Sequence, residues 1–214
     1  MAPISEHNRI GTLAESSLHA ALKEHLRQPG DHLEIPVDGY MIDLVRDSNL
    51  VEIQTGSFHQ IKPKLEKLLT DHAVELVYPI TQDKWIVRVS KEGELIRRRK
   101  SPKHAQWLDV FSELVYIAEW ITHSNFRLTL LKIHVDEIWR DDGEGSWRRK
   151  YWSIADRRLL EVTDSRTLCR PQDYLGLLPS GLPMPFTTRE LSDACGCRMR
   201  LAQQASYTLF HAGL

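Results

Sequence analysis

The first ninety residues switch between helical and strand-like spacing of their apolar positions. Apolar residues recur at helical spacing over residues 9–27, which predicts an amphipathic helix ending at Pro29-Gly30. Three strand-like segments with turn residues between them follow at 33–37, 40–45 and 50–55. A second helical pattern covers 58–70, and the unbroken apolar run at 73–80 is typical of a buried strand. The expected order is therefore helix, three-stranded meander, helix, strand.

The middle of the chain is less regular. A hairpin is expected around Glu92-Gly93, between strands at 85–89 and 94–99. Residues 104–122 are strongly apolar and predict a helix. Two further strands, a polar loop tip and a short helix are expected at 128–139, 150–162, 141–145 and 171–178. The pattern indicates a mixed α+β region.

The last segment begins with a stiff linker that contains Pro179, Pro183 and Pro185. Two short helices are expected after it, around the turn Cys195-Gly196-Cys197, with Thr187 or Thr188 as a cap. Two short helices around a glycine turn form a helix-turn-helix pattern, and this one looks like a winged-helix module. The strands of a wing do not follow it before Leu214.

Composition narrows the class of protein. No apolar run approaches the ~20 residues that span a bilayer, and the N-terminus lacks the pattern of a secretory signal. Three cysteines cannot build a disulfide framework, and no Cys/His set has the spacing of a structural zinc site. We therefore expect a cytoplasmic protein without a membrane segment.

The charges are unevenly distributed although the net charge is only -1. Residues 1–90 hold 9 Lys/Arg and 13 Asp/Glu, whereas residues 91–170 hold 16 and 13. An acidic part joined to a basic part fits a carboxylate site beside a surface that binds a polyanion, and it equally fits plain scatter of charge.

Candidate chemistry lies on the second and third strands of the meander. Asp43 interrupts an apolar strand, and side-chain alternation directs Glu52 and Gln54 to one face. If the two strands pair, Asp43 and Glu52 approach each other and repel unless a cation joins them. Oxygen ligands of this kind suit Mg²⁺ or Mn²⁺, and the Ile53 carbonyl is a third candidate ligand. The alternative is that both carboxylates lie on the solvent face of a one-sided sheet.

A helix, a three-stranded meander, a helix and a strand, with Asp43 on the second strand and Glu52-Ile53-Gln54 on the third, resemble the core of the PD-(D/E)XK nuclease superfamily. The resemblance covers about residues 6–90, and Glu15 takes the place of the acidic residue that members often carry on the first helix. It implies that Asp43, Glu52 and Glu15 serve metal-dependent hydrolysis and that Gln54 positions the attacking water. Gln54 departs from the family, which usually has lysine there, although Lys62 or Lys64 of the next helix could reach the site.

The fold class expected from these observations is α/β, with a restriction-endonuclease-like αβββαβ core. The three parts are a nuclease-like core, the mixed basic region and the winged-helix-like module, at 1–90, 91–178 and 179–214. The resemblance implies a metal-dependent DNA endonuclease of repair, recombination or defence. Two rival hypotheses are a catalytically inactive nuclease fold that binds DNA or assembles complexes, favoured by Gln54, and a protein-binding domain that dimerises through the apolar helix at 104–122.

Basic residues form three clusters that could contact duplex or branched DNA. They are Arg97, Arg98, Arg99 and Lys100; Arg148, Arg149 and Lys150; and Arg198 and Arg200. Arginine binds phosphate through two hydrogen bonds, and neighbouring aromatic rings such as Trp147 stack on bases. The alternative for the first two clusters is a solvated hairpin edge that basic residues protect from pairing.

Overall fold

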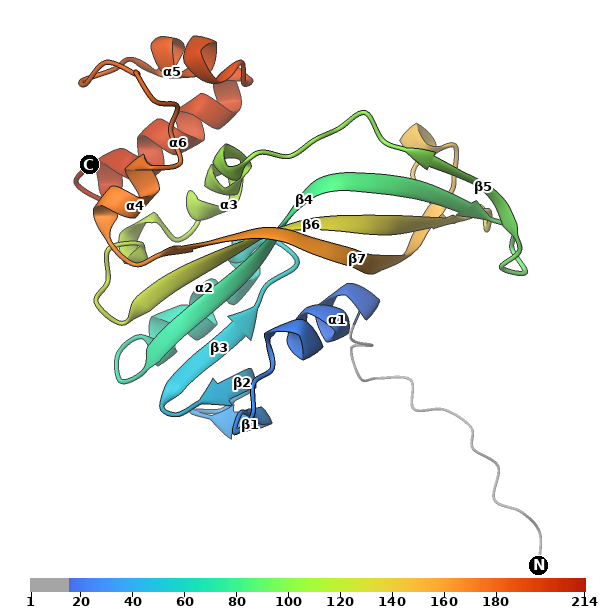
Figure 1. Cartoon of the computed structure of the whole chain (residues 1–214), viewed down its shortest axis with the longest axis horizontal. Coiled ribbons are helices and arrows are strands. Elements are labelled where there is room, and N and C mark those ends of the chain that lie inside the picture. Colours follow the sequence, from blue (N-terminus) through green and yellow to red (C-terminus); the bar gives the residue numbers. More distant parts are fainter. Residues whose placement is uncertain (1–15) are drawn as a thin grey trace, which may run out of the picture.

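A seven-stranded mixed sheet forms the centre of the computed structural model, which describes residues 16–214 (Figure 1). The strand order is β1-β2-β3-β4-β6-β7, and β5 pairs with β4 outside this path. Helix α1 lies at one side of the sheet, and the C-terminal helices gather at one end of it (Figure 1). The chain is therefore a mixed α/β protein.

The first part of the chain confirms the expected order of elements from residue 16 onward. The elements are α1 (Ser17–Leu26), β1 (His32–Val37), β2 (Tyr40–Arg46), β3 (Asn49–Ile53), α2 (Phe58–Leu68) and β4 (Ala73–Val89). Strands β1, β2 and β3 form an antiparallel meander, and α2 carries the chain across to β4, which is parallel to β3. Ser16 and Ser57 cap the two helices with their side chains. Residues 9–15 of the first predicted helix lie outside the described residues.

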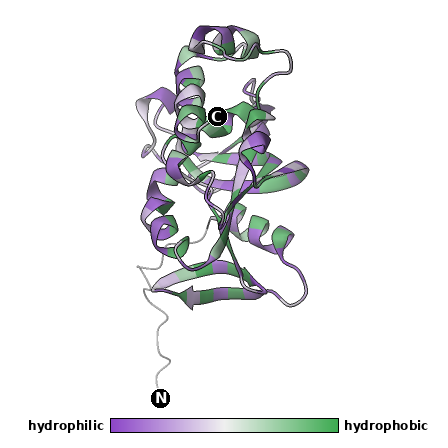
Figure 2. Cartoon of the chain, turned by 90° about the vertical axis from the view of Figure 1, so that its left-hand side faces the viewer, coloured by the Kyte–Doolittle hydropathy of each residue, from purple (hydrophilic) through white to green (hydrophobic). Residues whose placement is uncertain are grey.

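Two apolar clusters cover the two faces of the sheet. Neighbouring residues of β3 belong to different clusters, Leu50 to the one under α2 and Val51 to the one under α1. The alternation follows from the pleat of a strand, and Figure 2 shows it as alternating hydrophobic and hydrophilic segments along the strands. Helix α1 contributes Leu18 and Leu22 to its face, and both are buried.

Three long strands carry the sheet beyond the meander. They are β4, β6 (Phe126–Arg140) and β7 (Ser153–Leu168), and β5 (Leu95–Lys100) pairs with the far half of β4. The expected separate strands at 73–80 and 85–89 are one strand, because a β-bulge between Thr81 and Asp83 lets pairing continue through a polar stretch. The strands of the predicted middle region thus belong to the same sheet as the predicted core. The three-part division of the chain stays a prediction.

The helix expected at 104–122 is wrong. This segment forms short turns, namely η1 (Trp107–Val110), α3 (Phe111–Leu114) and η2 (Ala118–Trp120). Its apolar side chains are buried in the chain's own core, with Phe111, Leu114 and Ile117 fully enclosed. A segment that is buried on all sides is apolar throughout, and such a run does not distinguish a long helix from a series of short turns. The dimer surface expected at this segment stays a prediction.

The C-terminal helices confirm the predicted two-helix pattern. After α4 (Pro171–Leu175), helices α5 (Thr188–Cys195) and α6 (Met199–His211) flank Gly196, whose φ of 58° lies in the left-handed region that suits glycine. Ala202, Ala205 and Leu209 of α6 are buried in the same core as α2. No strand follows α6 within residues 16–214, so the winged-helix identity stays a prediction.

None of the helices within residues 16–214 is long and apolar enough to cross a bilayer.

Candidate functional site

Strands β2 and β3 separate at the predicted carboxylates. Their ladder runs from Arg46↔Asn49 to Leu44↔Val51, and its continuation would place Asp43 opposite Glu52. Here the Asp43 side chain, in place of a backbone carbonyl, bonds to β3. Its Oδ2 accepts a 2.8 Å hydrogen bond from the Ile53 backbone N–H. The strand pairing thus brings positions 43 and 52 together as expected, but the two side chains are directed to different helices, Asp43 to α1 and Glu52 to α2.

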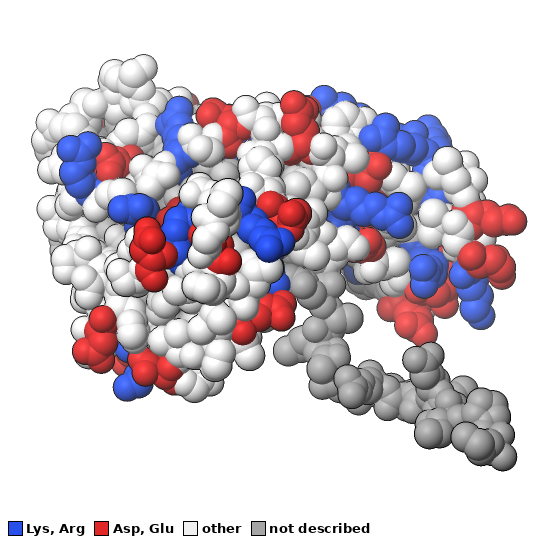
Figure 3. Space-filling model, turned by 60° about the horizontal axis from the view of Figure 1, so that its bottom comes forward, with Lys and Arg blue, Asp and Glu red and all other residues white. Residues whose placement is uncertain are grey.

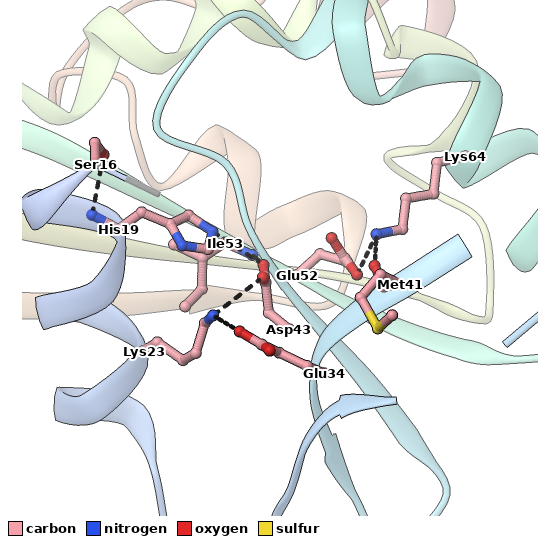
Figure 4. Close-up of polar contacts among 9 residues, drawn as sticks. All are labelled: Ser16, His19, Lys23, Glu34, Met41, Asp43, Glu52, Ile53 and Lys64. Atoms are coloured by element: carbon pink, nitrogen blue, oxygen red, sulfur yellow. Dashed lines mark hydrogen bonds and ion pairs between the residues drawn. The ribbon is translucent and has the colours of Figure 1, made fainter. Parts of the chain in front are cut away.

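Asp43 is directed toward helix α1. Its Oδ2 lies 3.2 Å from His19 Nε2, and its Oδ1 lies 4.0 Å from Lys23 Nζ, which also binds Glu34 at 3.0 Å (Figure 4). Burial would raise the pKa of Asp43, but hydrogen bonds from His19 and Ile53 outweigh it and lower the pKa. Asp43 is therefore a stabilised anion that joins α1 to both strands.

Glu52 is directed toward helix α2. Only 5% of the residue is exposed, and its Oε1 forms a 2.5 Å ion pair with Lys64 Nζ (Figure 4). Lys64 also donates a 2.6 Å hydrogen bond to the Met41 carbonyl. Burial raises the pKa of Glu52 to about 7, although Lys64 acts in the opposite direction, and the charge of Asp43 adds to the increase. Glu52 is therefore a strained anion, because the ammonium offsets only part of its desolvation.

The other predicted catalytic residues are placed differently. The Gln54 side chain donates through Nε2 to the Ser57 carbonyl at 2.8 Å, which fixes the loop that leads into α2. Of the two candidate lysines, Lys64 reaches Glu52, whereas Lys62 forms a 2.6 Å ion pair with Glu119. Glu15 lies outside the described residues. Lys64 is thus the candidate lysine that contacts a predicted site residue.

The donor set suits a hard divalent cation in its chemistry. Asp43 and Glu52 supply carboxylate oxygens, and Mg²⁺ is commonly held by one or two carboxylates while it keeps several waters. Glu52 Oε1 is buried and, apart from its ion pair with Lys64, has no hydrogen-bond donor. As placed, however, the two carboxylates face different partners (Figure 4). Residues 16–214 contain no group of three His, Cys, Asp or Glu side chains that could hold a metal.

The predicted nucleic-acid contacts lie on three separate surfaces. Arg97 to Lys100 lie in the exposed strand β5, where Arg98 pairs with Asp136 at 2.9 Å and Lys100 with Asp83 at 2.6 Å. Arg148, Arg149 and Lys150 lie at the short helix η3 (Trp147–Arg149), and Arg198 and Arg200 lie exposed at the start of α6. On the face shown in Figure 3, basic and acidic side chains are intermixed. Part of the basic charge is thus already balanced.

Comparison with known proteins identifies a family. Residues 16–169 match the model of a domain of unknown function, DUF8091, which spans the chain from α1 through β7. The chain is also 33% identical over 184 residues to an uncharacterized protein of Treponema pallidum (strain Nichols), covering 86% of this chain and 73% of that protein. No solved structure matches. The chain therefore belongs to the DUF8091 family.

Proposed function

We propose that this protein is a metal-dependent DNA nuclease with a PD-(D/E)XK-type core. The contact of Lys64 with Glu52 carries the proposal, because it supplies from α2 the cation that Gln54 does not provide on β3. The order α1-β1-β2-β3-α2-β4, with a meander followed by a parallel crossover, supports the same assignment. Repair, recombination and defence stay the expected settings.

Residues on both separated strands and on α2 would have distinct roles in binding the cation and the phosphate. Asp43 and Glu52 would hold the cation, with the Ile53 carbonyl as a further ligand. When bound, such a cation polarises a phosphodiester and lowers the pKa of a water. Lys64 would balance the charge of the phosphate beside Glu52, and Asp43 would keep β2 and β3 apart through its bond to the Ile53 N–H.

Two lysines on the same helix give a matched test. Supercoiled, linear and branched DNA would be incubated with Mg²⁺ or Mn²⁺ and with wild type, Glu52→Gln, Lys64→Met or Lys62→Met. We expect Glu52→Gln to abolish cleavage and Lys64→Met to slow it by about a hundredfold, the usual loss for one charge-stabilising group. Lys62→Met is the control, because Lys62 pairs with Glu119 and not with Glu52. Cleavage that survives Glu52→Gln, or that falls equally in both lysine variants, would exclude this site.

The second candidate function is a nuclease-like scaffold that binds DNA without cutting it. It is favoured by the cationic groups that already accompany both carboxylates, Lys64 at Glu52 and His19 with Lys23 at Asp43. Calorimetric titration of Mg²⁺ and Mn²⁺ into wild type and Asp43→Asn separates the two. Binding in wild type that is lost in the variant supports the nuclease, whereas no binding in wild type together with retained DNA affinity supports the scaffold.

A further inference from the structure

Three neighbouring cavities share wall residues, and together they are called the groove. Cavities of about 1000 and 520 Å³ share the wall residues Leu18, Thr55 and Arg157. The second of them shares Lys103, Arg198 and others with a third cavity of about 900 Å³. Thr55 lies just beyond the end of β3, and Arg198 begins α6. The groove therefore connects the end of the strand that carries Glu52 with the C-terminal helices.

The groove is basic although the chain is not. Its walls contain eight Lys/Arg and four Asp/Glu side chains, whereas the whole chain has a net charge of -1. The acids are mostly occupied within the protein, since Glu113 accepts a 2.9 Å bond from the Phe58 N–H and Glu137 pairs with Lys84 at 2.8 Å. Among residues 16–214, Lys103, Arg198 and Arg200 have no ion pair. A free positive charge therefore remains along the groove.

Aromatic rings accompany these cations in the cavity next to α6. Tyr116 lines this cavity and is 38% exposed. Trp107 forms another part of the wall, but it is only 8% exposed, and the guanidinium of Arg166 lies 4.9 Å from its ring centre. Tyr116 is therefore the ring available for stacking. Proteins bind single strands through cations along a groove with exposed aromatic rings, because phosphates meet the cations and unpaired bases stack on the rings. A duplex presents no unpaired base faces to such a wall.

We propose that the groove binds a single nucleic-acid strand and leads it toward the Glu52 end of β3. This inference deepens the proposed function and rests on it for the choice of nucleic acid as the polyanion. It moves the binding surface away from the β5 cluster, because Arg97 and Arg99 do not line the three cavities. It keeps Arg198 and Arg200 and adds Lys103, Arg166 and Tyr116.

The test measures binding without cleavage. Binding would be measured by fluorescence anisotropy in EDTA with a labelled oligothymidylate and with a duplex of equal length. The strand is chosen longer than a single-strand-binding domain covers, which is about 4–16 nucleotides. The variant Arg198→Glu/Arg200→Glu is compared with Arg97→Glu/Arg99→Glu, which changes charge equally on exposed β5. We expect the first to weaken strand binding at least about tenfold and to lower the salt slope by about 1.4, and the second to change affinity less than about twofold.

A further variant separates stacking from charge. Tyr116→Leu should weaken binding of the single strand and leave the salt slope unchanged, because it removes a ring and no cation. Circular dichroism melts would confirm that each variant is folded. Equal losses in the groove and β5 variants, or a duplex that binds as tightly as the strand, would overturn the groove. Wild type that binds no nucleic acid would overturn both proposals, whereas strand binding without metal-dependent cleavage would overturn only the nuclease.

Discussion

Replacing Glu52 by glutamine should remove a loss of stability that the protein undergoes between pH 4.5 and pH 7. Glu52 is 5% exposed, and burial raises its pKa from 4.5 to about 7. Below pH 4.5 the carboxyl is protonated in both the folded and the unfolded chain, so burial costs nothing. As pH rises from 4.5 to 7, the unfolded chain loses this proton first, and the free energy of unfolding falls. Above about pH 7 the contribution is constant.

The size of the effect follows from the same two values. The difference between 4.5 and about 7 corresponds to at most about 3 kcal/mol of the free energy of unfolding. Glutamine has nearly the same shape and no titratable group, so Glu52→Gln avoids this loss. Lys64 keeps its hydrogen bond to the Met41 carbonyl in the variant. We therefore expect the stability of the variant relative to wild type to increase by up to about 3 kcal/mol between pH 4 and pH 8.

Urea unfolding of both proteins across this pH range measures the difference, and the other titrating groups cancel in the comparison. Carbon NMR of the Glu52 carboxyl would give its titration directly. Lys64→Met serves as a second variant, because loss of the ammonium should move the Glu52 midpoint above 7. A stability difference that does not change with pH, or a Glu52 midpoint near 4.5, would refute the assignment of Glu52 as a desolvated anion.

Two further predictions concern regions away from this site. Arg46 binds Asp31 through hydrogen bonds of 2.9 and 2.8 Å, so Arg46→Ala should lower the free energy of unfolding by about 2–3 kcal/mol at pH 7 in urea titrations. Arg46 also lowers the pKa of Asp31, so the loss should shrink as pH falls below 3.8, and a loss that is constant with pH would contradict this. A Cβ at Gly145 would lie 1.8 Å from the Trp152 carbonyl oxygen, so Gly145→Ala should expose the loop at 141–152 to limited proteolysis. Cleavage at the wild-type rate would show that the loop adapts.

The sequence predicted the meander because the information there is local. Strand β2 is a short apolar run that Asp43 interrupts, and Asp38-Gly39 marks the turn before it. The helix predicted at 104–122 was wrong because this segment is apolar throughout. Its side chains are buried in the core, so its apolar positions carry no information on the backbone conformation. The long strand β4 was divided in two because its bulge at Thr81 and Asp83 places polar residues in the middle of the strand.

The candidate site was predicted in part. The sequence paired Asp43 with Glu52 but could not choose between Lys62 and Lys64. Residues two apart on a helix point about 200° apart, so only one of them could face the sheet, and the packing of α2 selects Lys64. The groove was missed because Lys103, Arg166 and Arg198 are distant in sequence and converge only in the folded chain.

Asp43 and Glu52 differ in their contribution to stability, and this difference helps to separate the nuclease from the DNA-binding scaffold. Asp43 accepts the Ile53 N–H and binds His19, so its removal should cost stability whether or not the protein is an enzyme. Glu52 opposes folding as pH rises above 4.5, and a neutral residue there should remove this pH-dependent loss. A scaffold gains nothing from such a residue, whereas a nuclease needs the anion for its cation. A Glu52→Gln protein that is folded, lacks this pH-dependent loss and is inactive would therefore favour the nuclease. One that lacks the loss and is fully functional would favour the scaffold.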